Sequence, residues 1–264
     1  MRSMFGKALL VGVAVLAGCT RSAPAPERRS DDVHTRAAAV VQDAANVTEA
    51  PVDPGPVRTE EIVLPGDRPA YVVRGARVHR RAMVFLAGMC THPGGYVMAF
   101  QHTAASRGDL VGLQGDVSCG GDGAMRMWSS DLEKLDRRID AAFVAAGLPV
   151  PSEVLVIGYS QGAERAERLM ERWPTKYTRA ILIASPITPS PARLHGTAAI
   201  ALMAGSFDIA QARMRDAAAP LVRAGIPARY SVIPKAHHGE LGDTPEDTMR
   251  AALDFVDAPT DGAP

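Results

Sequence analysis

One short stretch constrains the fold of this chain more than any other. The apolar run Val154–Ile157 leads directly into Gly158–Gly162, with the sequence GYSQG, and then into the charge-rich amphipathic segment Ala163–Arg172. A strand, a sharp turn and a helix in this order are the setting in which a G-x-S-x-G string forms a nucleophile elbow. The elbow needs glycine at positions 158 and 162, because side chains there would collide with the neighbouring backbone. The same string also occurs in ordinary strand-to-helix turns, so its meaning depends on the rest of the chain.

Composition and charge limit the classes of function. The chain has 264 residues, of which 47% are hydrophobic, and this suits one sizeable globular domain with extensions. Lys and Arg together number 29, as do Asp and Glu, so the net charge is zero and a basic nucleic-acid-binding surface is not expected. We expect no cofactor and no metal site, because His92, His102, His237 and His238 do not have a typical ligand spacing.

The N-terminal residues 1–19 have the features of an export signal. A short, positively charged segment precedes the apolar run Ala8–Ala17, which is too short to span a bilayer comfortably and ends in small residues. The string Leu16–Cys19 resembles the bacterial lipobox, and this resemblance implies cleavage before Cys19 and lipidation of that cysteine. An ordinary secretory signal with an incidental cysteine is the alternative. We expect a lipid-anchored protein of the bacterial cell envelope, in the outer membrane if the species is Gram-negative, because Thr20 rather than aspartate follows the cysteine.

Three further segments follow the signal. Residues 20–58 are rich in Pro and Ala and are predicted to be a flexible tether, and residues 258–264 are predicted to be a disordered tail. Between them, residues 59–257 alternate predicted strands with predicted helices, including helices over Tyr96–Arg107 and over Asp131–Ala146 with Ser130 as N-cap. Several strands are continuous apolar runs, which indicates a mostly parallel sheet covered by helices on both faces.

Two or three leading strands followed by strict alternation resemble the α/β-hydrolase fold with eight strands, over about residues 59–257. That family orders its catalytic triad as serine, acid and histidine. Asp208 follows an apolar strand after Ser160, where the family places its acid, and His238 follows the last strand in the family-like string PKAHHG. His237 is a competing base, and Asp208 has the alternative role of a solvated helix cap. The resemblance implies that His238 takes the Ser160 proton while Asp208 fixes the histidine tautomer.

The same resemblance assigns two backbone N–H groups to an oxyanion hole, those of Gln161 and Met89. The loop after the third strand, Leu86–Gly95, resembles the family's His-Gly motif, but Ala87 stands where the histidine is usual. We therefore expect altered support of this loop. The later loop, Ser185–Gly196, is too short for a lid domain.

The chain has three cysteines. If Cys19 is lipidated, Cys90 and Cys119 remain as a pair in an oxidising compartment. Both follow predicted strands, Ala82–Leu86 and Leu110–Leu113, and the resemblance implies that these strands are neighbours. A disulfide and two free buried thiols both fit the sequence.

The spacing of the triad candidates resembles the carboxylesterase and dienelactone-hydrolase branches more than the cutinases, which also carry GYSQG. We expect a serine hydrolase that cleaves small-molecule carboxylic esters, with thioesters as a further candidate. A peptidase on the same fold is one alternative, and a catalytically silent binding lipoprotein, motivated by Ala87, is another. The acyl and alcohol groups and the oligomeric state stay open. Residues that either line the pocket or pack in the core are Tyr159, Met89, Met125, Met127 and Trp128.

Overall fold

The structure, a computed structural model, describes residues 56–75, 81–121 and 123–258. The predicted export signal with Cys19, most of the predicted tether and nearly all of the predicted tail lie outside the described residues. Within the described part of the chain, no helix is both long enough and apolar enough to cross a membrane.

The central sheet has eight strands in the order β1-β2-β4-β3-β7-β8-β9-β10. The pairs β1–β2 and β2–β4 are antiparallel, and all other neighbouring pairs are parallel. The predicted eight-stranded, mostly parallel sheet is therefore confirmed. Its strands are β1 (Thr59–Ile62), β2 (Ala70–Val73), β3 (Arg81–Leu86), β4 (Gly108–Leu113), β7 (Val154–Tyr159), β8 (Tyr177–Ile183), β9 (Ala199–Gly205) and β10 (Ala228–Ile233).

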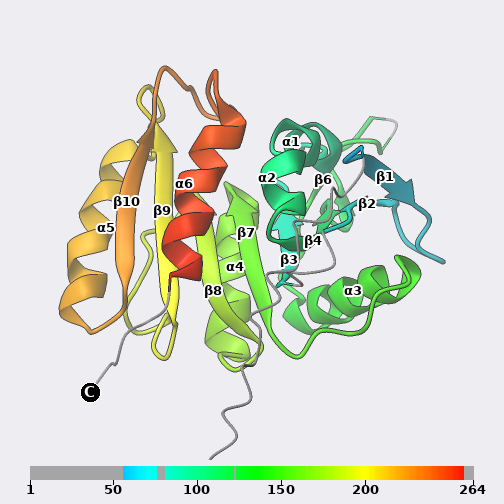
Figure 1. Cartoon of the computed structure of the whole chain (residues 1–264), viewed down its shortest axis with the longest axis horizontal. Helices are drawn as coiled ribbons and strands as arrows, with labels where there is room; N and C mark the ends of the chain where they lie inside the picture. The colour runs from blue at the N-terminus through cyan, green and yellow to red at the C-terminus, as the bar shows by residue number, and fades with distance from the viewer. Residues whose placement is uncertain (1–55, 76–80, 122, 259–264) are drawn as a thin grey trace, which may run out of the picture. The chain divides into compact units, whose positions relative to one another are not determined.

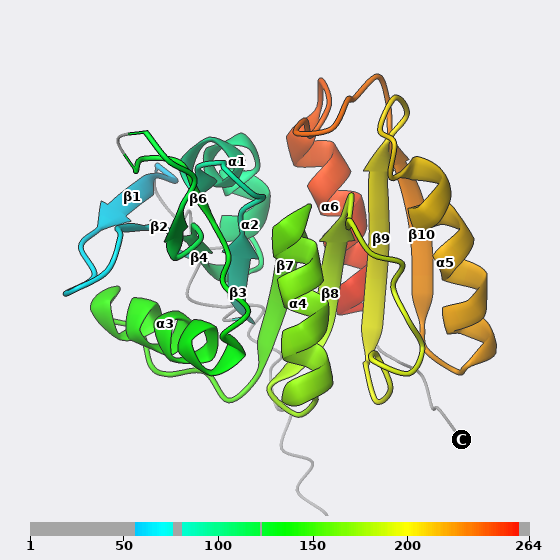
Figure 2. The same cartoon turned by 180° about the vertical axis from the view of Figure 1, so that it is seen from behind.

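Helices cover both faces of this sheet (Figures 1 and 2). Helix α6 lies beside α2 on one face, while α4 packs on β7 and β8 from the opposite face. Because both faces are covered, strands β7 and β9 are buried along their whole length and are almost entirely apolar. The helices are α1 (Pro93–Ala99), α2 (Gln101–Ala105), α3 (Leu132–Ala145), α4 (Gln161–Arg172), α5 (Gln211–Arg223) and α6 (Pro245–Asp257).

One local prediction was incomplete and one was wrong. The segment Tyr96–Arg107 is helical as far as Ala105, as predicted, but it forms two helices, because Phe100 has a non-helical backbone (φ −132°, ψ 28°). Its ring is buried against that of Phe85. The cap expected at Ser130 is supplied by Asp131, whose carboxylate accepts the Lys134 N–H at 2.8 Å. Aspartate and serine are both good caps, and the sequence pattern does not determine which of two adjacent candidates is used.

The segment from Gln114 to Ser129, which we call the strap, leaves the sheet after β4. It contains a small hairpin of β5 (Val117–Ser118) and β6 (Arg126–Met127) where the sequence indicated only a glycine-rich loop. A disulfide joins Cys119 of the strap to Cys90, in the loop after β3. Of the two alternatives left open by the sequence, the structure has the disulfide, and β3 and β4 are parallel neighbours as expected.

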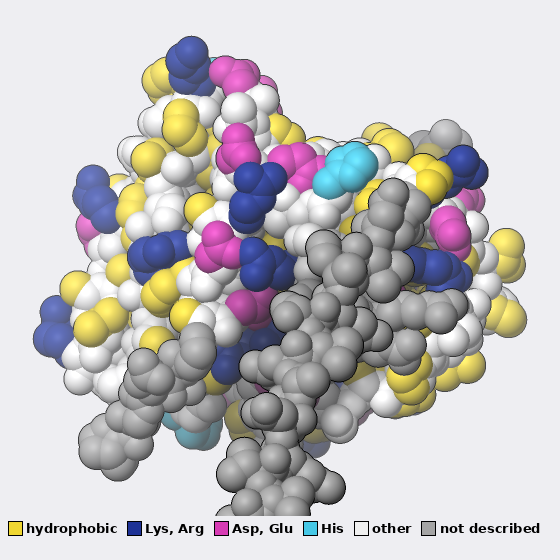
Figure 3. Space-filling model, viewed as in Figure 1, with side chains coloured by type: hydrophobic (Ala, Val, Ile, Leu, Met, Phe, Trp, Pro, Cys, Tyr) yellow, Lys and Arg dark blue, Asp and Glu magenta, His cyan; other side chains and the backbone are white. Residues whose placement is uncertain are grey.

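Basic and acidic side chains are interspersed on the face of the molecule shown in Figure 3. This distribution on that face accords with the zero net charge of the chain.

Candidate active site

The turn between β7 and α4 has the geometry of a nucleophile elbow. Ser160 has φ 51° and ψ −119°, a conformation that L-residues rarely adopt, and its N–H donates to Ile183 O at 2.8 Å. A Cβ added at Gly162 would lie 2.0 Å from Leu86 O, and one at Gly158 would lie 2.5 Å from Ala163 Cα. The prediction that side chains at both glycines would collide with the backbone is therefore confirmed.

The structure brings Ser160, His238 and Asp208 into one hydrogen-bonded chain. His238 Nε2 lies 3.0 Å from Ser160 Oγ, and His238 Nδ1 lies 2.9 Å from Asp208 Oδ2. The Asp208 side chain is fully buried, whereas that of His238 is 46% exposed. Because a buried carboxylate accepts the proton on Nδ1, Nε2 is left to accept the serine proton.

Each of these side chains follows a strand of the parallel sheet: β7 ends before Ser160, β9 before Asp208 and β10 before His238. The second oxygen of Asp208, Oδ1, accepts the Ala210 N–H at 2.8 Å, which fixes the carboxylate. Asp208 is therefore not a solvated cap. The ring of His237 packs on Phe207, with centroids 5.1 Å apart, and it is His238 that contacts Ser160.

Two tyrosines hold the loop that carries His238. The buried Tyr159 hydroxyl accepts the Gly239 N–H at 2.7 Å, and the Tyr96 hydroxyl donates to Gly239 O at 2.8 Å. The Tyr159 ring lies edge-on to the His238 ring, with centroids 5.7 Å apart. Burial raises the pKa of Tyr159 well above the usual range, so its hydroxyl stays protonated. The sequence indicated only a pocket or core role for Tyr159, and no sequence signal connects Tyr96 to the site.

If the chain has the ester hydrolase activity expected from the sequence, replacing Tyr159 with Phe should lower kcat about 10-fold with little change in KM. The change leaves the partly buried Gly239 N–H without its acceptor, at a cost of about 1–2 kcal/mol, and loosens the His238 loop. Steady-state kinetics and urea unfolding measure both effects. Tyr96→Phe is the matched control with a smaller expected effect, because Gly239 O is exposed to water. Equal effects of the two variants would contradict this explanation.

The loop from Ala87 to Cys90, which we call the oxyanion loop, lies against Ser160. A Cβ added at Gly88 would be 3.3 Å from Ser160 Cβ. Within the described residues, neither the Met89 N–H nor the Gln161 N–H donates a hydrogen bond to the protein. Both N–H groups are thus available to an external acceptor. The Met89 side chain is exposed, so it does not pack in the core.

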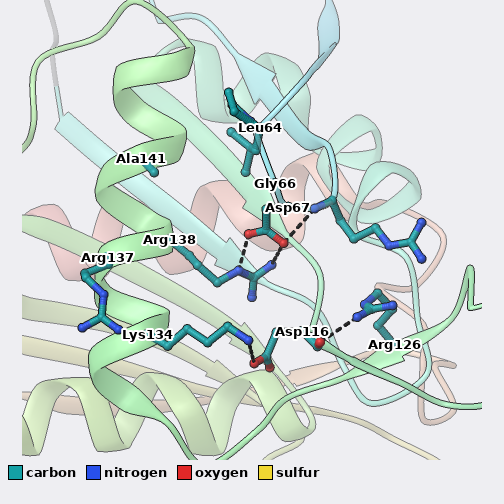
Figure 4. A pocket seen from close by; sticks show the side chains of 11 residues that line it. Leu64, Gly66, Asp67, Asp116, Arg126, Lys134, Arg137, Arg138 and Ala141 are labelled. Carbon is teal, nitrogen blue, oxygen red and sulfur yellow. Dashed lines mark hydrogen bonds and ion pairs between the residues drawn. The ribbon is translucent and has the colours of Figure 1, made fainter.

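The strap, α3 and the β1–β2 turn line a cavity of about 600 Å³ (Figure 4). Asp116 lies at its edge and accepts hydrogen bonds from Lys134 Nζ and from both the N–H and the hydroxyl of Ser129, each at 2.8 Å. Burial alone would raise the pKa of Asp116, but the hydrogen bonds from Lys134 and Ser129 outweigh it and lower the pKa to about 2. The ionised carboxylate therefore ties the end of the strap to α3.

Replacing Asp116 with Asn is expected to destabilise the protein at neutral pH and much less in acid. Since the folded-state pKa is below the ordinary value of 3.8, the stabilisation is present above about pH 4 and is lost as the pH falls through about 2. Urea unfolding of the wild type and the variant at a series of pH values measures this. Asp216→Asn, at an exposed position, is the control and should change little at any pH. A difference in unfolding free energy between wild type and Asp116→Asn that does not shrink in acid would contradict the assignment.

Among the described residues there is no group of three or more His, Cys, Asp or Glu side chains arranged to hold a metal ion. His92 serves instead as the N-cap of α1, where Nδ1 accepts the Gly94 N–H at 3.3 Å.

This chain is similar to known proteins in structure, but no similar sequence was found. The sequence matches no protein-family model and no curated protein. Among solved structures, it is similar to the fluorophosphonate-binding serine hydrolase FphF of Staphylococcus aureus, with a TM-score of 0.57 and 12% identity over 77% of this chain and 98% of that one. A ferulic acid esterase matches with a TM-score of 0.56 and 14% identity, over 76% of this chain and 96% of the other. The chain has the α/β-hydrolase fold.

Esterase PE8 is a further similar structure, with a TM-score of 0.54 and 20% identity over 70% of this chain and 97% of that one. At these identities the likeness shows the α/β-hydrolase fold alone. The function of the chain has to be argued from its own site.

Proposed function

We propose that the protein is a serine hydrolase that cleaves carboxylic esters through an acyl-enzyme on Ser160. The observation that carries the proposal is the hydrogen-bonded chain from Ser160 Oγ through His238 to the buried Asp208. Such a chain turns a weakly nucleophilic hydroxyl into a nucleophile, because the imidazole takes its proton as the new bond forms. The similarity in fold to esterases and serine hydrolases gives further support.

In the acylation half-reaction, Ser160 Oγ attacks the ester carbonyl carbon and its proton passes to His238 Nε2. The carbonyl oxygen becomes an oxyanion, for which the free Met89 and Gln161 N–H groups are the proposed donors. Collapse of the tetrahedral intermediate breaks the bond to the alkoxy group, which leaves as the alcohol with the proton held by His238. In the second half-reaction, His238 activates a water molecule that releases the acid and restores Ser160.

The substrate proposed is a small, uncharged ester, and a thioester would follow the same steps. Met89 belongs to the oxyanion loop and Phe207 directly precedes Asp208, and their exposed apolar side chains favour an apolar acyl group over a charged one. The direct test combines p-nitrophenyl esters from acetate to long acyl chains with a fluorophosphonate probe, which forms a covalent adduct on an activated serine. Turnover and a single adduct mapped to the Ser160 peptide are expected. Absence of both overturns the proposal.

Two other functions remain as outcomes of the same experiment. Turnover of amide substrates at a rate comparable with esters would favour a peptidase. Absence of turnover and labelling would favour a silent binding protein on the same fold.

We also propose that Cys19 carries a lipid and anchors the protein in the bacterial cell envelope, in the outer membrane if the species is Gram-negative. The support is the Leu16–Cys19 string alone. Incorporation of labelled palmitate by the full-length chain, and its loss in Cys19→Ser, is the expected result. A secreted, unlabelled mature chain would overturn this proposal and leave the hydrolase proposal unaffected.

A further inference from the structure

We propose that Trp128 is a positioning residue that holds the oxyanion loop in its productive conformation, in place of the loop histidine for which this chain has Ala87. The inference rests on the proposed hydrolase function and specifies which residues outside the triad that function requires. It is carried by hydrogen bonds between the strap, the oxyanion loop and the residue that follows the nucleophile.

Trp128 contacts the oxyanion loop directly. Its indole Nε1–H donates to Ala87 O at 2.6 Å, and Trp128 and Ala87 are both buried. The Ala87 N–H donates to Leu113 O at 3.1 Å, so the position of Ala87 is fixed on both sides. The next carbonyl, Gly88 O, accepts the Thr91 hydroxyl at 2.9 Å.

These bonds fix two consecutive peptide planes, one after Ala87 and one after Gly88. The second plane carries the Met89 N–H, and Gly88 joins it to the first. Without the indole donor, Ala87 O would be a buried carbonyl with no partner, and rotation of its peptide plane would relieve this. Such a rotation would turn the following Met89 N–H away from the substrate.

Trp128 is itself held on two sides. Its backbone N–H donates to Gln161 Oε1 at 2.9 Å, and its carbonyl accepts from Gln161 Nε2 at 3.3 Å. The guanidinium carbon of Arg138 lies 5.5 Å from the indole ring centroid, and Arg138 is fixed in turn by two hydrogen bonds to Asp67 (Figure 4). A cation over an aromatic face favours one ring orientation.

Gln161 connects the two halves of the proposed oxyanion hole. Its backbone supplies one N–H, while its side chain holds the strap that supports the loop supplying the other. The disulfide and a 2.7 Å hydrogen bond from Cys90 N–H to Arg126 O tie the end of the oxyanion loop to the same strap. Cys90 has φ +55°, so this end of the loop is in a conformation that needs such support.

The test is Trp128→Phe, which keeps an aromatic ring beside Arg138 and removes the N–H donor. We expect kcat to fall about 10- to 100-fold, less than loss of a whole oxyanion donor, with KM within about threefold. An aryl trifluoromethyl ketone, which forms an oxyanionic adduct with the serine, should bind more weakly by the same factor as the loss in kcat/KM. A residue with only a packing role would not lower ketone affinity and kcat/KM by the same factor.

Trp173→Phe is the matched control, since Trp173 is the only other tryptophan of the chain and lies at the C-terminus of α4. It should leave kcat and ketone affinity within about twofold of wild type. Should Trp128→Phe fail to fold, Gln161→Ala keeps the backbone N–H, releases Trp128, and is expected to show the same matched loss. Unchanged kcat and ketone affinity in a folded, soluble variant would overturn the inference. A wild-type protein that neither turns over esters nor reacts with the fluorophosphonate would instead overturn the proposed function.

Discussion

Ser160→Ala is expected to lower kcat for ester hydrolysis by about 10⁶-fold, with the fold and the substrate affinity retained. The hydroxyl oxygen is the only heavy atom removed, and in the structure its partner is His238 Nε2. The change therefore removes the nucleophile and few packing contacts. Steady-state kinetics on p-nitrophenyl acetate measures the loss of kcat, and the thermal unfolding midpoint measures whether the fold is retained. The fluorophosphonate adduct should disappear together with the activity.

A suitable control is Ser129→Ala, because Ser129 is a serine in the strap whose hydroxyl donates to Asp116. It should retain the fluorophosphonate adduct. Ser160→Ala with more than about one thousandth of wild-type activity would point to a different nucleophile and refute the acyl-enzyme mechanism.

His238→Ala is the change with the second-largest expected effect, again a loss of about 10⁶-fold in kcat. The imidazole is the group that both accepts the serine proton and returns it to the leaving alcohol, and its loss removes the partner of the buried Asp208 Oδ2. The cost to stability should be moderate, because Asp208 Oδ1 keeps the Ala210 N–H. The readouts are kcat and the rate of fluorophosphonate labelling.

The neighbouring histidine gives a control of the same residue type. His237→Ala should stay within a few-fold of wild type, because its ring contacts Phe207 on the surface and not Ser160. Addition of free imidazole should restore part of the activity of His238→Ala, since that variant has space where the ring was. Comparable losses in the two variants would mean that both histidines share the role of base.

The sequence predicts this fold and the triad candidates well because both depend on local patterns. Continuous apolar runs mark buried parallel strands, and Ser160, Asp208 and His238 each follow such a run directly. Once the strands lie parallel, their carboxyl ends meet at one edge of the sheet, so chain order is enough to bring these side chains together. The collision of side chains at the elbow glycines is likewise a local property.

The supports of the site could not be predicted, because they join residues that are distant in the chain and carry no periodic pattern. The Tyr96 and Tyr159 hydroxyls meet Gly239 only after β10 has paired, and the Trp128 indole reaches Ala87 across the strap. In the sequence the strap is a glycine-rich stretch without hydrophobic periodicity, which indicates a loop and nothing about its path. Such hydrogen bonds depend on tertiary position.

Strand β10 lies at the edge of the sheet and pairs with β9 alone, yet it precedes the loop with the proposed base. The elbow and the strap lie before residue 228 in the chain, whereas the loop that carries Asp208 is held by later residues, because the Ser206 and Phe207 N–H groups donate to Ile233 O and Ala236 O. Under the proposed mechanism, a polypeptide that stops before residue 228 lacks His238 and these supports of the acid, and we expect it to be inactive toward esters. Ester turnover under this mechanism would require that β10 has docked, so the measured activity would also report completed folding of the domain.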